Sequence, residues 1–219
     1  KNGDLVVGDI LHTLSSKAQD EVRSVVESLP EDSLNIEAIN MGDYNLSKFR
    51  KEIESVRDYV EEGVRIAIVA PVEGLNPLEQ GVVTWLIGNS LGRPLNQSVT
   101  PDGKPYSKLH PLYDRKRDIS REKGGRYSED RFGGDSHTDN VNTEERWEYL
   151  VLGSIFSAYA GGENGIISGL TIQEILKREY PEEYEALQKP IMWEKKGLTK
   201  IPIFYEASPL TVREDGSPW

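Results

Sequence analysis

The chain has 219 residues, no cysteine and a formal net charge of −11, from 37 acidic and 26 basic residues. A chain of this length can bury a core without disulfides, and the lack of cysteine excludes disulfide scaffolds, thiolate metal sites and a thiol nucleophile. The acidic balance argues against nucleic-acid binding, which needs a clustered basic face, and no apolar run approaches the roughly 20 residues that span a bilayer. We therefore expect one domain over residues 1–219 that binds a small molecule in the cytoplasm.

The first 95 residues have the pattern of mixed α/β structure. Ser16 is a candidate cap for a first helix, and Asn45 is a candidate cap for a second. The β-branched, apolar run at residues 65–72 predicts a buried strand. Asn76 and Glu79 then form a capping box at the start of a third helix.

The character of the chain changes at residues 97–142, which are polar and rich in Gly, Asp, Arg and Ser. Long segments without a clear period are typical of lids and binding loops, so we expect an active-site loop here. The apolar run at 149–160 is long enough for a fully buried strand plus a turn. Short strand-like runs at 191–193, 201–205 and 210–212 favour a jelly roll or barrel.

One of only three histidines, His137, stands two residues before Asp139. Residues two apart in a strand point to the same face, so this pair could chelate one metal ion. One histidine and one carboxylate are two of the three ligands of the facial triad that leaves open positions on non-haem iron(II). The spacing alone also fits a surface loop in which Asp139 caps a turn.

A Gly-Gly turn follows this motif at a characteristic distance. Asn164 ends the sequence Gly161-Gly162-Glu163-Asn164, directly after the run at 149–160. The arrangement resembles the clavaminate synthase/taurine dioxygenase-like family of iron(II)/2-oxoglutarate oxygenases, in which a His-x-Asp or His-x-Glu motif precedes a Gly-Gly-[Asp/Glu]-[Thr/Ser] turn. The resemblance touches most of residues 60–213, and these two motifs are its specific part.

The resemblance implies a double-stranded β-helix (jelly-roll) core with flanking helices, in a mixed α/β chain. It implies Fe(II) held by His137 and Asp139, with 2-oxoglutarate and O2 as co-substrates. Asn164 stands where the family has a Thr or Ser that hydrogen-bonds 2-oxoglutarate, and an Asn amide can donate a comparable bond. Asn140 and Asn142 would face the substrate pocket, or serve equally well as turn residues.

The residue at position 139 bears on the type of reaction. Related halogenases carry Gly or Ala there, so Asp139 implies hydroxylation with release of succinate and CO2. The polar segment 97–142 and the resemblance to amino-acid-modifying members imply a free amino acid or similar small polar metabolite as the substrate. The alternative is a catalytically silent jelly-roll protein that binds a small molecule without a complete iron site.

The family also needs a second histidine well downstream, and an arginine beyond it that grips the far carboxylate of 2-oxoglutarate. No histidine follows His137, and use of His110 would reverse the family's chain order. We therefore expect the natural protein to continue past Trp219 with a His-containing strand and an Arg, which would complete the C-terminal part of the jelly roll. A full-length gene that stops at Trp219 would contradict this expectation.

Overall fold

The computed structural model of the chain describes residues 6–30, 35–99, 105–114, 134, 136–139, 147–194, 204–213 and 216. The chain divides into two compact units. The N-terminal unit comprises Lys1–Gln97, Ser107–Leu109 and Tyr149–Tyr159, and the C-terminal unit comprises Ser98–Tyr106, His110–Glu148 and Ala160–Trp219. Two compact units can belong to one domain, so the single domain expected from the sequence stays a prediction.

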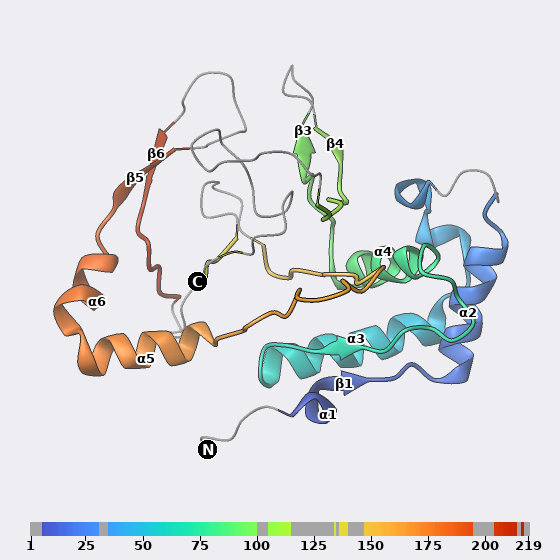
Figure 1. Cartoon of the computed structure of the whole chain (residues 1–219), viewed down its shortest axis with the longest axis horizontal. Helices are drawn as coiled ribbons and strands as arrows, with labels where there is room; N and C mark the ends of the chain where they lie inside the picture. The colour runs from blue at the N-terminus through green and yellow to red at the C-terminus, as the bar shows by residue number, and fades with distance from the viewer. Residues whose placement is uncertain are drawn as a thin grey trace. The chain divides into compact units, whose positions relative to one another are not determined.

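Three helices dominate the N-terminal unit: α2 (Ser16–Glu27), α3 (Ser47–Glu62) and α4 (Gln80–Leu91) (Figure 1). Both α2 and α4 pack against α3. The smaller elements are α1 (Val7–Ile10), the 3₁₀ turns η1 (Ile36–Ala38) and η2 (Met41–Asp43), and the parallel pair β1 (Leu11–His12) and β2 (Ile68–Val69). The strand expected over residues 65–72 is therefore present only as this two-residue pairing.

The starts of the helices refine the capping predictions. Ser15, not Ser16, caps α2, with its hydroxyl accepting from the N–H of Ala18. Asn45 does not cap α3; the carboxylate of Glu21 accepts from the N–H groups of Lys48 and Phe49 at 3.2 and 2.8 Å. A carboxylate from another helix thus supplies the acceptors that an N-cap residue usually provides.

The capping box before α4 is confirmed. The side chain of Asn76 accepts from the N–H of Glu79 at 3.0 Å, and the carboxylate of Glu79 accepts from the N–H of Asn76 at 2.7 Å. The structure places these reciprocal bonds in the turn just before Gln80, the first residue of α4. They satisfy donors that a helix N-terminus would otherwise leave unpaired.

The core of the N-terminal unit lies between these helices. Its buried side chains are Leu14, Ala18, Val22, Val25, Ile39, Leu46, Phe49, Ile53, Val72, Val82, Val83, Trp85 and Leu86. The indole N–H of Trp85 donates to the carbonyl of Ile39 at 3.2 Å, so the polar atom of this buried ring is satisfied. The buried side chains of the three helices and of the segments between them thus form one apolar interior.

The run at 149–160 was expected to form a buried strand, and this expectation is wrong. The structure shows no strand here, and the large apolar side chains are exposed: Leu150, Leu152, Phe156 and Tyr159. Apolar composition alone did not distinguish a core strand from an extended segment that runs along the helices of its unit. The consequence is an exposed apolar segment directly before the Gly-Gly turn.

The C-terminal unit contains α5 (Gly169–Glu179), α6 (Pro181–Leu187) and the antiparallel strands β5 (Ile191–Glu194) and β6 (Phe204–Ala207). Trp193 stands opposite Tyr205, and its indole N–H donates to the carbonyl of Ala207 at 2.9 Å. The amide of Gln173, a buried polar group of α5, donates to Tyr184 Oη and the carbonyl of Gly216.

The described residues mix helix and strand, as expected. Their strands form three two-stranded sheets: β1 with β2, β3 (Ser98–Val99) with β4 (Pro105–Ser107), and β5 with β6. None of these sheets closes on itself, so the double-stranded β-helix stays a prediction for this chain. Among the helices of the described residues, none has the length and apolar character needed to cross a bilayer.

The core predicts a contrast between two leucines. Leu86 in α4 is 0% exposed, whereas Leu78 just before α4 is 60% exposed. Leu86→Ala should lower the free energy of unfolding by about 2–5 kcal/mol, because it removes buried methyl groups and leaves a cavity. Leu78→Ala, the matched control, should change it by less than about 0.5 kcal/mol. Urea unfolding measures both, and equal losses would contradict the core as described.

Candidate functional site

His137 and Asp139 lie next to each other. His137 Nε2 is 3.5 Å from Asp139 Oδ1, and the two side chains are 54% and 45% exposed. Residues 136–139 do not form a strand, so the shared face expected from strand geometry is not the reason for their proximity. The structure thus brings together the two residues that the sequence singled out as metal ligands.

The geometry of this pair can be tested against a metal ion. Nitrogen and oxygen ligands lie about 2.1 Å from a divalent transition metal, and two such ligands at right angles are about 3.0 Å apart. The observed 3.5 Å is the distance of a direct pair between the two side chains and is about 0.5 Å longer than that value. A metal ion would have to replace this direct contact, with a small shift of one side chain.

A complete ligand set is not found within the part of the chain that the structure describes. No group of three His, Cys, Asp or Glu side chains in those residues could hold a metal ion. His110 is described and belongs to the same unit as His137, but it is not part of such a group. His137 and Asp139 on their own make a two-ligand site.

The Gly-Gly turn is a real feature of the backbone. Gly161 and Gly162 have φ values of 79° and 89°, in the left-handed region that favours glycine. Asn164 follows the turn with its side chain exposed, and its amide donates to the carbonyl of Gly162 at 3.3 Å. Within the described residues Asn164 makes no hydrogen bond to His137 or Asp139. The amide lies at a surface from which it could donate to a ligand instead.

The predicted substrate residues Asn140 and Asn142 lie outside the described residues. The same holds for most of the expected active-site loop at 97–142, of which the structure describes 97–99, 105–114, 134 and 136–139. Both predictions therefore stay open.

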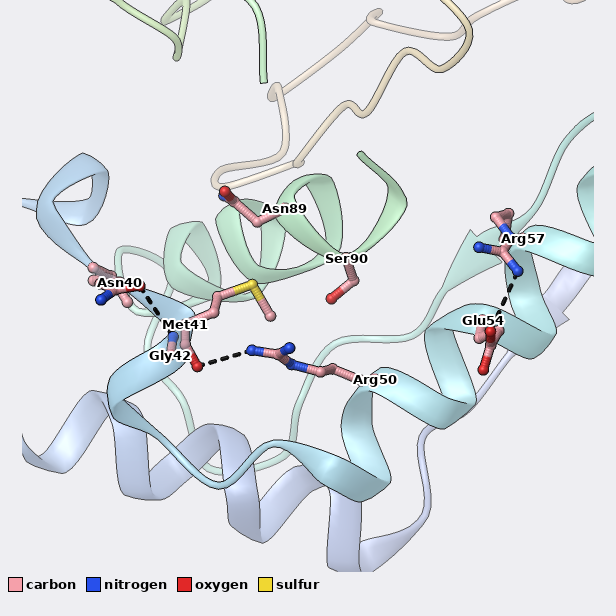
Figure 2. Close-up of a pocket in the computed structure, with 9 residues that line it drawn as sticks. Asn40, Met41, Gly42, Arg50, Glu54, Arg57, Asn89 and Ser90 are labelled. Atoms are coloured by element: carbon pink, nitrogen blue, oxygen red, sulfur yellow. Dashed lines mark hydrogen bonds and ion pairs between the residues drawn. The ribbon is translucent and has the colours of Figure 1, made fainter. Parts of the chain in front are cut away.

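A groove of about 530 Å³ lies within the N-terminal unit, between η2, α3 and α4. It is lined by Ile39, Asn40, Met41, Gly42, Arg50, Glu54, Arg57, Asn89 and Ser90 (Figure 2). No sequence motif predicts this groove, and its one local signal is the helical spacing of Arg50, Glu54 and Arg57 on one face of α3.

The charges in this groove are largely balanced. Arg57 lies within 4.0 Å of the carboxylates of Glu54, Asp58 and Glu61. These acids raise the pKa of Arg57, and the hydrogen bond that Arg57 donates to Asp58 has the largest effect. The guanidinium of Arg50 donates to the carbonyl of Met41 at 2.9 Å and so supports η2 (Figure 2). Two guanidinium groups and one carboxylate line the groove itself, and Asp58 and Glu61 beside Arg57 offset part of its positive charge.

Comparisons of the chain with protein-family models, curated proteins and solved structures find no match. The functional argument therefore depends on the residues themselves, and the His137–Asp139 pair is the arrangement with the most definite chemistry.

Proposed function

We propose that this chain is a non-haem iron(II)/2-oxoglutarate-dependent oxygenase, with His137 and Asp139 as two of the metal ligands. The observation that carries the proposal is the 3.5 Å separation of His137 Nε2 and Asp139 Oδ1 in accessible side chains. An imidazole beside a carboxylate is the donor combination of the facial triad. The Gly-Gly turn that the resemblance requires supports the same reading, since both glycines have positive φ.

When bound, Fe(II) supplies oxidative chemistry that couples O2 and 2-oxoglutarate to hydroxylation of a substrate, with release of succinate and CO2. The chain's own residues would bind the ion and orient the molecules that react beside it. His137 contributes a neutral nitrogen donor, and Asp139 contributes a negative charge that partly offsets the charge of the cation. Because Asp139 fills a ligand position that halogenases leave open, we propose hydroxylation and not halogenation.

Asn164 is the residue of the described chain that we propose for 2-oxoglutarate. Its amide already donates at 3.3 Å to the carbonyl of Gly162, and an amide has a second N–H that remains for a carboxylate oxygen. Asn140 and Asn142 are proposed for contact with the substrate because they directly follow the metal motif.

The chain contains no cysteine, which suits a reducing compartment. We propose a cytoplasmic protein on this basis, with a small molecule as the partner of the site.

The metal site is tested in the full-length protein by adding Fe(II) and 2-oxoglutarate without oxygen. We expect the weak visible charge-transfer band of the ternary complex. His137→Ala or Asp139→Ala should weaken Fe(II) binding by more than about 100-fold, because loss of even an outer partner of a ligand costs 10–100-fold. His110→Ala is the matched control and should keep the band. Loss of the band in His110→Ala, with the band kept in His137→Ala, would contradict the proposed ligands.

The substrate class is a separate prediction. A free amino acid should stimulate succinate release by the protein loaded with Fe(II) and 2-oxoglutarate in air, because a correctly bound substrate couples the two half-reactions. A screen of the common amino acids measures this directly. Succinate release that none of them stimulates would contradict the substrate class while leaving the iron site in place.

A catalytically silent binding protein is the second candidate. The finding that favours it is the lack of a three-ligand group within the described residues. The same experiment separates the two candidates, because a silent protein shows neither the charge-transfer band nor succinate production.

A further inference from the structure

Asn164 is followed directly by Gly165, in a stretch where every residue from 156 to 172 is exposed. Residues 161–168 form no helix or strand, and the N–H of Gly165 makes no hydrogen bond within the part of the chain that the structure describes. Asn2-Gly3, the other Asn-Gly pair of the sequence, lies outside the described residues. Asparagine is one of the thermolabile residues of proteins, and glycine places the least hindered backbone nitrogen directly after it.

The reaction open to this pair is intramolecular, which brings the two reacting groups together at no entropic cost of encounter. The backbone nitrogen of Gly165 attacks Cγ of Asn164, so a new C–N bond closes a succinimide ring. The bond from Cγ to the side-chain nitrogen breaks, and this nitrogen leaves as ammonia with the proton of the Gly165 N–H.

Water then opens the ring at one of two bonds. Cleavage between Cγ and the Gly165 nitrogen gives aspartate, and cleavage between the carbonyl carbon of Asn164 and that nitrogen gives isoaspartate. In sum, an amide and water become a carboxylate and ammonium, with nothing oxidised or reduced.

The local contacts of Asn164 and Gly165 oppose this reaction only weakly. The amide of Asn164 donates to the carbonyl of Gly162 at 3.3 Å, which is longer than a typical hydrogen bond. The net contribution of one such bond is small, so breaking it slows the attack by about tenfold at most. Nothing packs over the backbone of Gly165, because a Cβ built there meets no atom within 4 Å.

Another asparagine before a small residue is held by a helix. Asn89 precedes Ser90 inside α4, and its amide donates to the carbonyl of Trp85 at 2.8 Å. The hydroxyl of Ser90 donates to the carbonyl of Leu86, also at 2.8 Å. An attack by the Ser90 nitrogen would have to break the backbone bonds of α4, so it requires local unfolding of the helix.

We propose that Asn164 is a site of spontaneous deamidation through the backbone nitrogen of Gly165. The product has one more negative charge and lacks the two N–H groups of the amide. In the isoaspartate form, the backbone after the Gly-Gly turn is also longer by one carbon.

The modification has a consequence for the candidate site, and this part rests on the proposed function. Because the amide of Asn164 is the donor that we propose for 2-oxoglutarate, deamidation replaces a donor by a negative charge beside an anionic ligand. The protein would therefore lose affinity for 2-oxoglutarate as it ages.

The test incubates the full-length protein at neutral pH over days and follows the peptides that contain Asn164 and Asn89 by mass spectrometry. We expect the Asn164 peptide to gain one dalton and to separate into aspartate and isoaspartate forms, while the Asn89 peptide stays unchanged. Gly165→Ala is the matched variant, because a Cβ has room there and φ of Gly165 lies outside the left-handed region. It should slow the reaction about tenfold, since the added methyl group hinders the approach of the nitrogen.

Three results would overturn the proposal. One is an Asn164 peptide that gains no mass, and another is an equal rate in the wild type and in Gly165→Ala. The third is modification of Asn89 as fast as that of Asn164, because the fold would then not select the site.

The consequence for 2-oxoglutarate is measured separately with Asn164→Asp, which has the charge of the aspartate product from the start. Titration of 2-oxoglutarate into the Fe(II)-loaded protein without oxygen should show about 10- to 100-fold weaker binding than in the wild type. Gly165→Ala should bind like the wild type. Equal affinities in all three proteins, or no binding by the wild type, would contradict the proposed role of Asn164 and leave the deamidation site standing. Weaker binding in Asn164→Asp, with no mass gain in the wild type, would do the reverse.

Discussion

In the N-terminal unit, α2 and α3 each supply a carboxylate to the start of the other. Glu21 of α2 accepts from the N–H groups of Lys48 and Phe49, and Glu52 of α3 accepts from the N–H and hydroxyl of Ser15. These bonds satisfy donors that both helix N-termini would otherwise expose, and they place negative charge at the positive ends of two helix dipoles. The core around Phe49 depends on this exchange, because it sets how the two helices meet.

Backbone N–H groups held by glutamate recur throughout the unit. Glu79 closes the capping box before α4, and Glu37 holds residues 107–109. An acidic chain thus uses part of its negative charge internally, as acceptors for its own backbone. Glu61 likewise accepts from a donor far along the chain, here the hydroxyl of Tyr149.

Local signals in the sequence predicted local structure well. The capping box of Asn76 and Glu79 was predicted because its partners are three residues apart. The cap of α2 was predicted at Ser16, one residue after Ser15, which caps this helix in the structure. The partner of the α3 N-terminus, Glu21, lies 27 residues before Lys48. No periodicity or capping rule identifies an acceptor at that distance, because the pairing exists only once the two helices have packed.

The candidate site shows the same division between local features, which the sequence predicts, and long-range contacts, which it does not. His137 and Asp139 are two residues apart, so their proximity follows from local geometry whether the backbone is a strand or a turn. The Gly-Gly turn was likewise predictable, because glycine adopts positive φ far more readily than other residues. The exposed segment at 149–159 was misread as a buried strand, since apolar composition does not say which surface a segment covers. Glu37 and Glu61 accept from Ser107 and Tyr149, which lie roughly 70 and 90 positions away in the chain, and no pattern in the sequence reveals such pairings.

The use of carboxylates as backbone acceptors also makes the stability of the unit depend on pH. The pKa values of Glu37 and Glu52 lie below the ordinary value of 4.5. Burial raises each pKa, but the hydrogen bonds to the carboxylate and a nearby lysine lower it by more. In the unfolded chain these groups bind protons more readily, so their contribution to stability is complete above pH 4.5 and is lost as the pH falls through their lower, folded-state pKa values. One chemical event, protonation of glutamate, would therefore loosen the start of α2 and the attachment of residues 107–109 in the same range of acidity.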